Sequence, residues 1–553
     1  MNANVSLWNY RNQAVLLAIV LLGLFLRLNG LEWGLPNVFH PSYSYHPDEI
    51  YLLTWADWLR EGHIIPKQFI YGGTFYYLTL QFTNWVGLLL SEQIGGQLLF
   101  NTILFGRLCG VIYALVTLYL IYGTGTILFS RSVGLLAAFI LAVLPGHVFW
   151  AQRVRPDELF ALQFVVNLFF MARILKHQGN LKINLCLGGI LLGIATATRF
   201  PAAILILGYI VAMLFCLSSY FRENRAAATR KFFQYLGVIS GVAVLGYLVA
   251  SPHTIIYFSD FLAGMRVQWN YQSGGLSFIH GFGKGPSWFQ YAGRILRQAM
   301  GEPFQGLLFI ALLFAIWKRT KEHLLLLAIV VPYFLLLTKT SLVLTRYTIP
   351  LLPLFSLLIA YFLVEMAGRS KITKALVVTS IIASSSWSLA ANLAYANTLK
   401  TTDPRDAAAI WMAENVEGGA RIGAFVNYKG DLFSNPPMTR QHRWSGFNMK
   451  RDNIDLFLES SFDYIVVNEI PLLRRSLLGD DQIETSFRIL RDWNRRHPGY
   501  SLVRRFGNEA LFAGFDFSYL FNSQDYLLSR PQLLLYKKSG ASTPPESDGL
   551  IRQ

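Results

Sequence analysis

Long apolar runs separated by short polar loops recur along most of this sequence. A helix of roughly 17–25 apolar residues is long enough to cross about 30 Å of lipid hydrocarbon. About eleven runs approach that length, so the sequence predicts a polytopic α-helical membrane protein with about 11 transmembrane helices. Only 14% of the 553 residues are charged, whereas a soluble domain carries about a quarter, which excludes an ordinary soluble protein. The predicted spans lie near residues 13–29, 104–122, 132–149, 158–175, 183–198, 201–219, 233–250, 303–317, 323–338, 347–365 and 375–393.

Lys and Arg residues are concentrated in short loops between these runs, and the chain has a net charge of +16. Such a charge could indicate nucleic-acid binding, but its placement follows the positive-inside rule, so no nucleic-acid partner is predicted. The basic loops alternate with less basic ones along the chain, so they all lie on one side of the membrane. By the positive-inside rule that side is cytoplasmic. An odd number of spans then puts the N-terminus inside and everything after about residue 395 outside. The basic loops contain Arg173, Lys176 and Lys182; Arg222, Arg225, Arg230 and Lys231; Lys318, Arg319 and Lys321; and Arg369, Lys371 and Lys374.

Three stretches on the outer side are long enough to form structure of their own: the loops 30–103 and 251–302, and the C-terminal region. We expect a transmembrane domain at 1–395, a small extracytoplasmic α/β domain at 396–538 and a disordered tail at 539–553. The loop 251–302 is rich in Gly and aromatic residues, which favours an interfacial loop anchored by aromatics, with a mobile flap over a sugar site as the alternative. In the C-terminal region the pattern predicts helices at Ala407–Glu414 and Ser486–Arg496, and strands at Arg421–Val426, Tyr464–Val467, Tyr500–Arg505 and Leu533–Tyr536.

Two acidic tetrapeptides stand out on the predicted outer side: His46-Pro47-Asp48-Glu49 and Arg155-Pro156-Asp157-Glu158. Each is followed by a helical pattern, which is a surface-lying amphipathic helix over Leu52–Glu61 in the first case and a span in the second. Pro at a helix start followed by two carboxylates is ordinary capping chemistry, and capping explains either motif taken alone. The pair lies on one side of a chain with only 32 acidic residues, and acids at a membrane boundary tend to mark a functional cavity. These carboxylates could bind a divalent cation, and one could act as a general base.

Outward-facing arginines depart from the positive-inside pattern. Arg199 lies between the fifth and sixth predicted spans, and Arg346 and Tyr347 begin the outer end of the tenth. A lipid phosphate is a natural partner for a guanidinium at the outer interface, although snorkelling to lipid headgroups is an equal alternative for each arginine singly. Arg153, Arg155 and Lys339 are weaker candidates of the same kind. His46 could orient an acid or bind substrate, or could simply be structural.

These motifs, in this order, resemble the C-type integral-membrane glycosyltransferases, and most closely the bacterial branch related to protein O-mannosyltransferases and the lipid A aminoarabinose transferase. The resemblance covers nearly the whole chain and is strongest over residues 14–365. Three further features are similar to that branch: the run Ala195-Thr196-Ala197-Thr198-Arg199-Phe200, the Arg346-Tyr347 run with Pro350 and Pro353, and Trp411 at the start of a terminal domain.

The resemblance implies a polyprenyl-phosphate-linked sugar as donor, an inverting single displacement and, in many members, a divalent cation such as Mg²⁺ or Mn²⁺. The span architecture favours multi-pass insertion in a bacterial inner (plasma) membrane, with the endoplasmic reticulum as the alternative, and the topology makes the active site and the C-terminal domain extracytoplasmic. The acceptor stays open among a glycolipid, a polysaccharide and a protein. By position, the resemblance assigns catalysis to Asp48, Glu49 and Asp157, and metal binding to Asp48, Asp157 and Glu158. The residues themselves suggest substrate binding by His46, Arg155, Arg199, Arg346 and Tyr347.

A transporter or flippase for a lipid-linked substrate is the alternative function. Transporters place charges near mid-membrane, often in broken helices related by inverted repeats. Here the candidate charges lie at the ends of the predicted spans, and the sequence has no evident internal repeat. A membrane scaffold has no need for paired acids. The sequence therefore favours a glycosyltransferase over both.

Overall fold

The computed structural model of the protein describes residues 2–49, 61–63, 74–272, 286–340, 343–426, 436–437, 441–448, 462–468, 499–521, 526, 529 and 531–539. The chain forms two compact units, and neither is one continuous stretch. The first unit is mainly helical and comprises Met1–Pro36, Ser42–Lys400 and Ala510–Tyr526; the second contains the larger sheet and comprises Asn37–Pro41, Thr401–Glu509 and Leu527–Gln553. This division differs from a single cut at residue 395, because a short C-terminal segment belongs to the helical unit.

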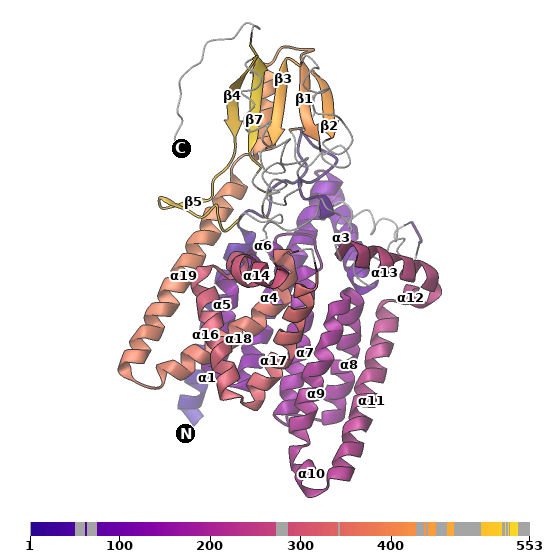
Figure 1. Ribbon diagram of the computed structural model, residues 1–553, viewed down its shortest axis with the longest axis vertical. Helices are drawn as coiled ribbons and strands as arrows, with labels where there is room; N and C mark the ends of the chain where they lie inside the picture. Colours follow the sequence, from indigo (N-terminus) through magenta and orange to yellow (C-terminus); the bar gives the residue numbers. More distant parts are fainter. Residues whose placement is uncertain are drawn as a thin grey trace. The chain divides into compact units, whose positions relative to one another are not determined.

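Long helices form the first unit, and Figure 1 shows many of them standing side by side. Eight helices in the described part are long and apolar enough to cross a membrane, or nine if one bent pair counts as a single span. The multi-pass prediction is therefore confirmed. Each predicted span coincides with one helix or with two consecutive helices, and those at 201–219 and 303–317 are shorter than 18 residues. The main helices are α1 (Asn2–Leu28), α4 (Leu98–Leu128), α5 (Arg131–Val143), α6 (Pro145–Ala151), α7 (Asp157–Leu175), α8 (Leu181–Thr198), α9 (Leu205–Cys216), α11 (Arg225–Ala250), α16 (Glu302–Lys318), α17 (Lys321–Thr338), α18 (Leu352–Ala367) and α19 (Lys371–Lys400).

The third predicted span is broken into α5 and α6, which meet at an angle of 64°. Leu144 between them has an extended backbone (φ −64°, ψ 123°), and Pro145 opens α6. Proline has no N–H to continue the helix and disfavours helical geometry in the residue before it, so the chain bends there. The bend makes α6 a separate short helix, and the chain then runs through Arg153 and Arg155 to α7.

Shorter elements lie between the long helices. The predicted first outer loop contains α3 (Thr74–Gln93), and the second contains α12 (His253–Ile256), α13 (Phe258–Gln272), α14 (Ser287–Gln290), the π-helix η2 (Tyr291–Ile295) and α15 (Leu296–Met300). The others are η1 (Phe200–Ile204), α10 (Ser218–Glu223) and η3 (Thr345–Leu351). Most of the amphipathic helix expected at Leu52–Glu61 and the central part of the possible flap, 273–285, lie outside the described residues.

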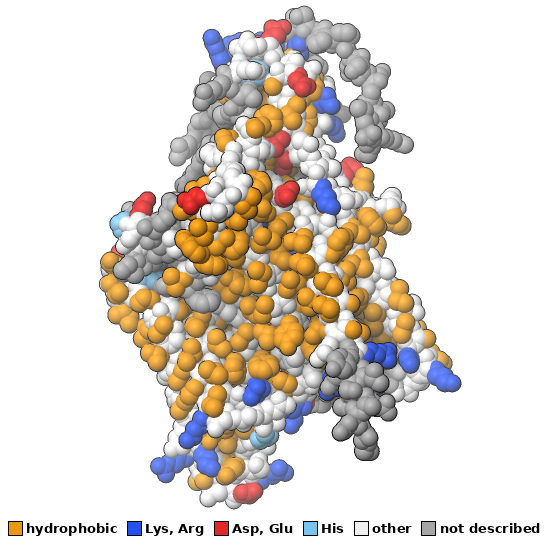
Figure 2. Space-filling model, turned by 180° about the vertical axis from the view of Figure 1, so that it is seen from behind, with side chains coloured by type: hydrophobic (Ala, Val, Ile, Leu, Met, Phe, Trp, Pro, Cys, Tyr) orange, Lys and Arg blue, Asp and Glu red, His pale blue; other side chains and the backbone are white. Residues whose placement is uncertain are grey.

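The surface of the helical unit carries a broad belt of hydrophobic side chains, and Lys and Arg side chains gather beyond it at the lower end in Figure 2. Exposed apolar side chains of the helical unit include Val244, Leu245, Leu313 and Trp317. Apolar side chains on the outside of a helical bundle are stable when lipid rather than water surrounds them. The surface thus agrees with a membrane-embedded unit.

The second unit is built on a five-stranded sheet with strand order β2-β1-β3-β7-β4. Strand β1 is parallel to β2 and β3, whereas β7 is antiparallel to β3 and β4. Helix α20 (Pro404–Asn415) buries Ala408 and Met412 in the same core as Ile422 and Leu533 of the sheet. The strands are β1 (Arg421–Val426), β2 (Arg443–Asn448), β3 (Tyr464–Asn468), β4 (Tyr500–Phe506) and β7 (Leu533–Lys538).

The predicted helix at Ala407–Glu414 and all four predicted strands are thus present, and the α/β prediction is confirmed. Strand β2 was not predicted from the sequence. The expected helix at Ser486–Arg496 and the expected disordered tail from residue 540 onward lie outside the described residues.

Candidate active site

Two aspartates and three arginines of the helical unit form one chain of ion pairs. Arg155 Nη1 contacts Asp48 Oδ2, and Arg346 Nη1 lies 3.6 Å from the same oxygen. Arg155 Nε donates to Asp157 Oδ2 at 3.0 Å, and Arg199 Nη2 donates to Asp157 Oδ1 at 2.8 Å. The order along this chain is therefore Arg346, Asp48, Arg155, Asp157, Arg199. We call these five side chains the ionic chain.

Proline controls the local backbone at several of these positions. Pro47 begins the helical turn that contains Asp48, and Pro156 immediately precedes α7, so that Asp157 lies in its first turn. Arg199 caps the C-terminus of α8 with an extended backbone, and Pro201 in the next turn has no N–H with which to continue the helix. Arg346 is the second residue of η3. The first outer loop, the α6–α7 turn, α8 and η3 therefore each contribute to the site.

Burial divides the ionic chain into a floor and a rim. The side chains of Arg155 and Asp157 are 0% and 1% exposed, whereas Asp48, Arg346 and Arg199 are 27%, 17% and 16% exposed. Burial, together with the nearby positive charge of Arg346, lowers the pKa of Arg155 to about 10, which still leaves it protonated at neutral pH. Three guanidiniums face two carboxylates, so the rim carries one excess positive charge and favours an anion.

Aromatic rings lie beside each guanidinium. The Arg346 guanidinium carbon is 5.7 Å from the centre of the Tyr347 ring, and Tyr333 donates its hydroxyl to the Tyr347 carbonyl oxygen at 3.3 Å. Arg155 is 5.7 Å from the Trp150 ring, and Arg199 is 5.8 Å from the Phe160 ring. Rings at this distance attract a cation and limit its movement. Tyr347 thus lies beside the site through its contact with Arg346, and its role in substrate binding stays a prediction.

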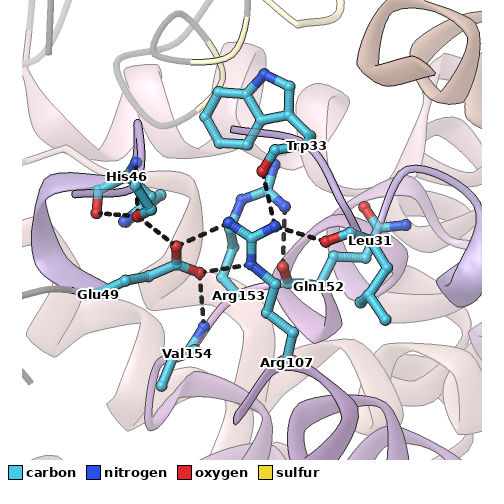
Figure 3. Close-up of polar contacts among 9 residues, drawn as sticks. Leu31, Trp33, His46, Glu49, Arg107, Gln152, Arg153 and Val154 are labelled. Atoms are coloured by element: carbon cyan, nitrogen blue, oxygen red, sulfur yellow. Dashed lines mark hydrogen bonds and ion pairs between the residues drawn. The ribbon is translucent and has the colours of Figure 1, made fainter. Parts of the chain in front are cut away.

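Glu49 lies in a separate buried clamp (Figure 3). Its carboxylate accepts two hydrogen bonds from Arg107, at 2.9 and 2.8 Å, one from the Val154 N–H at 3.1 Å and one from the Ser44 hydroxyl at 2.8 Å. Burial alone would raise the pKa of Glu49, but the Arg107 guanidinium outweighs it and lowers that pKa to about 2. A fully buried carboxylate with this many donors has no room for a substrate, so the geometry does not fit the expected catalytic role of Glu49.

Arg107 completes the clamp from helix α4. Its Nη1 donates to the carbonyl oxygens of Leu31 and Trp33, at 2.5 and 2.7 Å (Figure 3). The clamp therefore joins the end of α1, the loop that carries Asp48 and, through Val154, the turn that carries Arg155. Because Glu49 is the residue after Asp48, a fixed Glu49 also fixes the backbone of Asp48.

His46 is also part of the wall rather than the rim. The residue is 2% exposed, and its ring meets the Trp150 ring edge-on at 6.5 Å between centroids. Burial lowers the pKa of His46 well below its ordinary value, so the imidazole is neutral. A neutral, buried ring in this position does not fit the expected direct contact with substrate.

Glu158 points away from the ionic chain, because successive residues on a helix are about 100° apart. Its Oε2 lies 3.4 Å from His147 Nε2, and His147 Nδ1 lies 2.7 Å from Arg27 Nη2. All three side chains are buried at 1% exposure or less. The three carboxylates expected to share a metal ion therefore do not converge.

The expected divalent-cation site does not fit this arrangement. Mg²⁺ and Mn²⁺ need several oxygen ligands around one point. Asp48 and Asp157 instead direct their carboxylates at guanidiniums, and Glu158 faces His147. Within the described ranges, no group of three His, Cys, Asp or Glu side chains is arranged for a metal ion.

Sequence reasoning missed Arg107 and Arg27 as site-supporting residues, and it placed Arg153 only among the weaker candidates for a lipid phosphate. Arg107 lies inside the second predicted span and Arg27 inside the first, and a charge within a membrane span is itself a signal of a buried partner. Arg153 is buried with its guanidinium 4.6 Å from the Trp33 ring and 4.7 Å from the Phe149 ring. The partners of these arginines come from distant parts of the chain, which the sequence pattern does not reveal.

Comparison with known proteins gives a partial family match and a shared fold. Residues 90–256 match the family described as dolichyl-phosphate-mannose-protein mannosyltransferase. No curated protein matches the chain by sequence. The oligosaccharyltransferase of Archaeoglobus fulgidus in its apo form has 12% sequence identity and a TM-score of 0.51, over 94% of this chain and 78% of that one. At this identity the likeness establishes the fold.

Two other solved structures are less similar in fold. ArnT from Cupriavidus metallidurans bound to undecaprenyl phosphate has 14% identity and a TM-score of 0.48, over 96% of this chain and 99% of that one. The protein O-mannosyltransferase Pmt1-Pmt2 complex of S. cerevisiae has 16% identity and a TM-score of 0.35, over 51% of this chain and 36% of that one. The family match contains Arg155, Asp157 and Arg199 of the ionic chain. Residues 90–256 of the chain thus resemble the dolichyl-phosphate-mannose-protein mannosyltransferase family, and the chain shares its fold with the oligosaccharyltransferase of Archaeoglobus fulgidus.

Proposed function

We propose that this protein transfers a sugar from a polyprenyl-phosphate donor to the hydroxyl group of an extracytoplasmic acceptor. The observation that carries the proposal is the ionic chain, in which the partly exposed Asp48 carboxylate lies between the partly exposed Arg346 and the buried Arg155, and the partly exposed Arg199 lies at the other end. The description of the matched family names dolichyl-phosphate-mannose, a sugar on a polyprenyl-type phosphate. This supports a polyprenyl-phosphate-linked sugar as the donor here. The acceptor is a glycolipid, a polysaccharide or a protein.

Arg346 and Arg199 are the proposed phosphate ligands. Both are partly exposed, and they lie at the two ends of the ionic chain. Guanidinium groups form bidentate, charge-assisted hydrogen bonds to phosphate oxygens. As the bond between the sugar and the phosphate breaks, negative charge grows on the phosphate, and fixed cations stabilise that charge.

Asp48 is the proposed general base. It is the more exposed of the two aspartates, and its Oδ2 pairs with both Arg155 and Arg346. The acceptor oxygen attacks the anomeric carbon while its proton passes to the Asp48 carboxylate. The bond from that carbon to the phosphate oxygen breaks, its electron pair leaves with the polyprenyl phosphate, and the anomeric configuration inverts.

Asp157 fits a positioning role better than a catalytic one. Each of its carboxylate oxygens accepts a hydrogen bond from a different arginine, and its side chain is 1% exposed. Asp157 therefore holds Arg155 behind the base and Arg199 at the rim. In the same way Glu49 positions the loop of Asp48, which is the role we propose for it in place of catalysis.

Arginines, rather than a divalent cation, neutralise the phosphate in this proposal. Three guanidiniums already surround the two aspartates, and a divalent cation beside them would be strongly repelled. The side of the membrane follows from the positive-inside rule. The basic loops face the cytoplasm, so the ionic chain faces the opposite side of a cell inner membrane.

The first test is sugar turnover by the purified protein in nanodiscs, with a panel of radiolabelled polyprenyl-phosphate sugars and candidate acceptors. Wild-type protein is expected to release sugar from at least one donor. The matched control variant is Glu365→Gln, which loses a carboxylate paired with Lys318 far along α18 from η3. If liposomes containing wild-type protein move the intact donor across the bilayer and no donor is broken down, the transporter function is correct instead.

A further inference from the structure

A short C-terminal segment, Ala510–Tyr526, leaves the sheet unit and belongs to the helical unit. It begins with the hairpin of β5 (Leu511–Phe512) and β6 (Phe515–Asp516). The Phe517 ring then lies 4.9 Å from the Trp387 ring of α19, between centroids. The residues on both sides of this segment belong to the sheet unit, so the segment is a separate insertion into the helical unit.

Tyr526 at the end of this segment is fully buried. Its ring centroid lies 4.3 Å from that of Phe149 in α6 and 5.8 Å from that of Tyr395 in α19. Its hydroxyl donates to the Gln298 carbonyl oxygen at 3.3 Å. The aromatic packing leaves the ring little freedom, so the hydroxyl is held at α15, the short helix that contains Gln298.

Gln298 connects Tyr526 to the proposed phosphate site. Its side chain is 1% exposed, and its Oε1 accepts a hydrogen bond from the Thr345 hydroxyl at 3.2 Å. Thr345 is fully buried and is the first residue of η3. The next residue is Arg346, which reaches the partly exposed rim beside Asp48.

We propose that Gln298 is a positioning residue for Arg346 and that Tyr526 of the C-terminal segment holds Gln298 in place. The sequence of contacts is Tyr526 to Gln298, Gln298 to Thr345, and Thr345 through the backbone to Arg346. This inference rests on the proposed function, because it gives Arg346 the role of phosphate ligand. It makes the segment Ala510–Tyr526 part of the support of the donor site.

The test measures equilibrium binding of polyprenyl phosphate to full-length protein in nanodiscs, together with the thermal unfolding midpoint. Thr345→Val removes the hydroxyl that reaches Gln298 and keeps the side-chain shape, whereas Thr345→Ser keeps the hydroxyl. We expect Thr345→Val to weaken binding about fivefold, as loss of one buried hydrogen bond suggests, and Thr345→Ser to restore most of it. Tyr526→Phe removes only the hydroxyl at the other side of Gln298 and is expected to act in the same direction.

Thr117→Val is the matched control, because Thr117 is also fully buried and its hydroxyl donates to the Tyr113 carbonyl oxygen of its own helix. We expect it to leave the affinity unchanged. A double-mutant cycle then separates positioning from general stability. In an Arg346→Ala background, Thr345→Val is expected to have almost no further effect on affinity, because the residue that it positions is gone.

Two different failures are distinguishable. If Arg346→Ala leaves the affinity for polyprenyl phosphate unchanged, the proposed phosphate role of Arg346 is wrong and the inference falls with it. If Arg346→Ala weakens binding but Thr345→Val and Tyr526→Phe do not, or if their effects add fully to that of Arg346→Ala, the positioning role alone is wrong. If Thr345→Val does not fold, Tyr526→Phe decides between these outcomes.

Discussion

Asp48 and Asp157 are joined by a single guanidinium: Arg155 contacts Asp48 through Nη1 and donates to Asp157 through Nε at 3.0 Å. The two aspartates belong to motifs far apart in the sequence, and Arg155 is itself part of the second motif. This bridge sets the distance between Asp48, the proposed base, and Asp157, which holds Arg199 at the rim. It also makes Arg155 the residue on which the geometry of the site depends most directly.

Arg155→Lys is expected to lower the transfer rate by about tenfold or more while the protein remains folded. Lysine keeps the positive charge but cannot form the planar fork that reaches both aspartates. The measurement is the single-turnover transfer rate with a saturating donor, alongside the thermal unfolding midpoint. A Lys variant with the wild-type rate would show that the bridge has no catalytic importance.

Glu49→Gln is expected to destabilise the protein by about 3 kcal/mol, because it leaves the buried Arg107 without a charged partner. Thermal unfolding in detergent, compared with Glu365→Gln, measures the effect. If Glu49→Gln and Glu365→Gln unfold at the same temperature, the ion pair of Glu49 with Arg107 does not stabilise the protein.

The clamp also predicts how stability depends on pH. The pKa of Glu49 is about 2 in the folded protein and roughly 4.3 in an unfolded chain. The stabilisation is therefore complete above the unfolded value and is lost as the pH falls from there towards 2. Over this acidic range the unfolding midpoint of wild type should fall towards that of Glu49→Gln, and a constant difference between the two would contradict the pairing.

Asp48→Asn is expected to bind polyprenyl phosphate at least as tightly as wild type. Asp48 and the phosphate are both anions that use Arg346, so removal of the carboxylate frees this guanidinium for the lipid. The same nanodisc binding assay measures the change. Weaker binding by Asp48→Asn would mean that the carboxylate helps to hold the donor, for example through a cation.

EDTA is expected to leave the transfer rate unchanged, because the carboxylates at the site are paired with arginines rather than arranged around a cation. The measurement compares rates before and after chelation and dialysis. A loss of activity that Mg²⁺ or Mn²⁺ restores would contradict the role assigned to the arginines.

Much of the helical fold was predictable because lipid imposes length and apolarity on every span. The sequence also predicts that Asp48, Asp157, Arg199 and Arg346 lie on the same, outer side of the membrane, and the ionic chain joins all four. The insertion of Ala510–Tyr526 into the helical unit was not predicted. Its contacts join residues far apart in the chain, and no local periodicity encodes them.

The neighbouring acids Glu49 and Glu158 were harder to assign. A motif gives residue types but not side-chain directions, and consecutive helical residues point about 100° apart. Glu49 therefore reaches Arg107 and Glu158 reaches His147, while their neighbours join the ionic chain. The predicted metal site does not fit the structure, because the prediction rested on the number of carboxylates and did not include the arginines that pair with them.

The most direct test of the central claim is the single-turnover rate of sugar transfer by wild type, Asp48→Asn and Glu365→Gln, with the stereochemistry of the product determined. A general base contributes about 100- to 10,000-fold, so Asp48→Asn should lose at least about 100-fold in rate while it remains folded and binds donor. Glu365→Gln should match wild type, and the product should have the inverted anomeric configuration. A folded Asp48→Asn protein that transfers sugar at the wild-type rate, or a product with retained configuration, would contradict the assignment of Asp48 as the base.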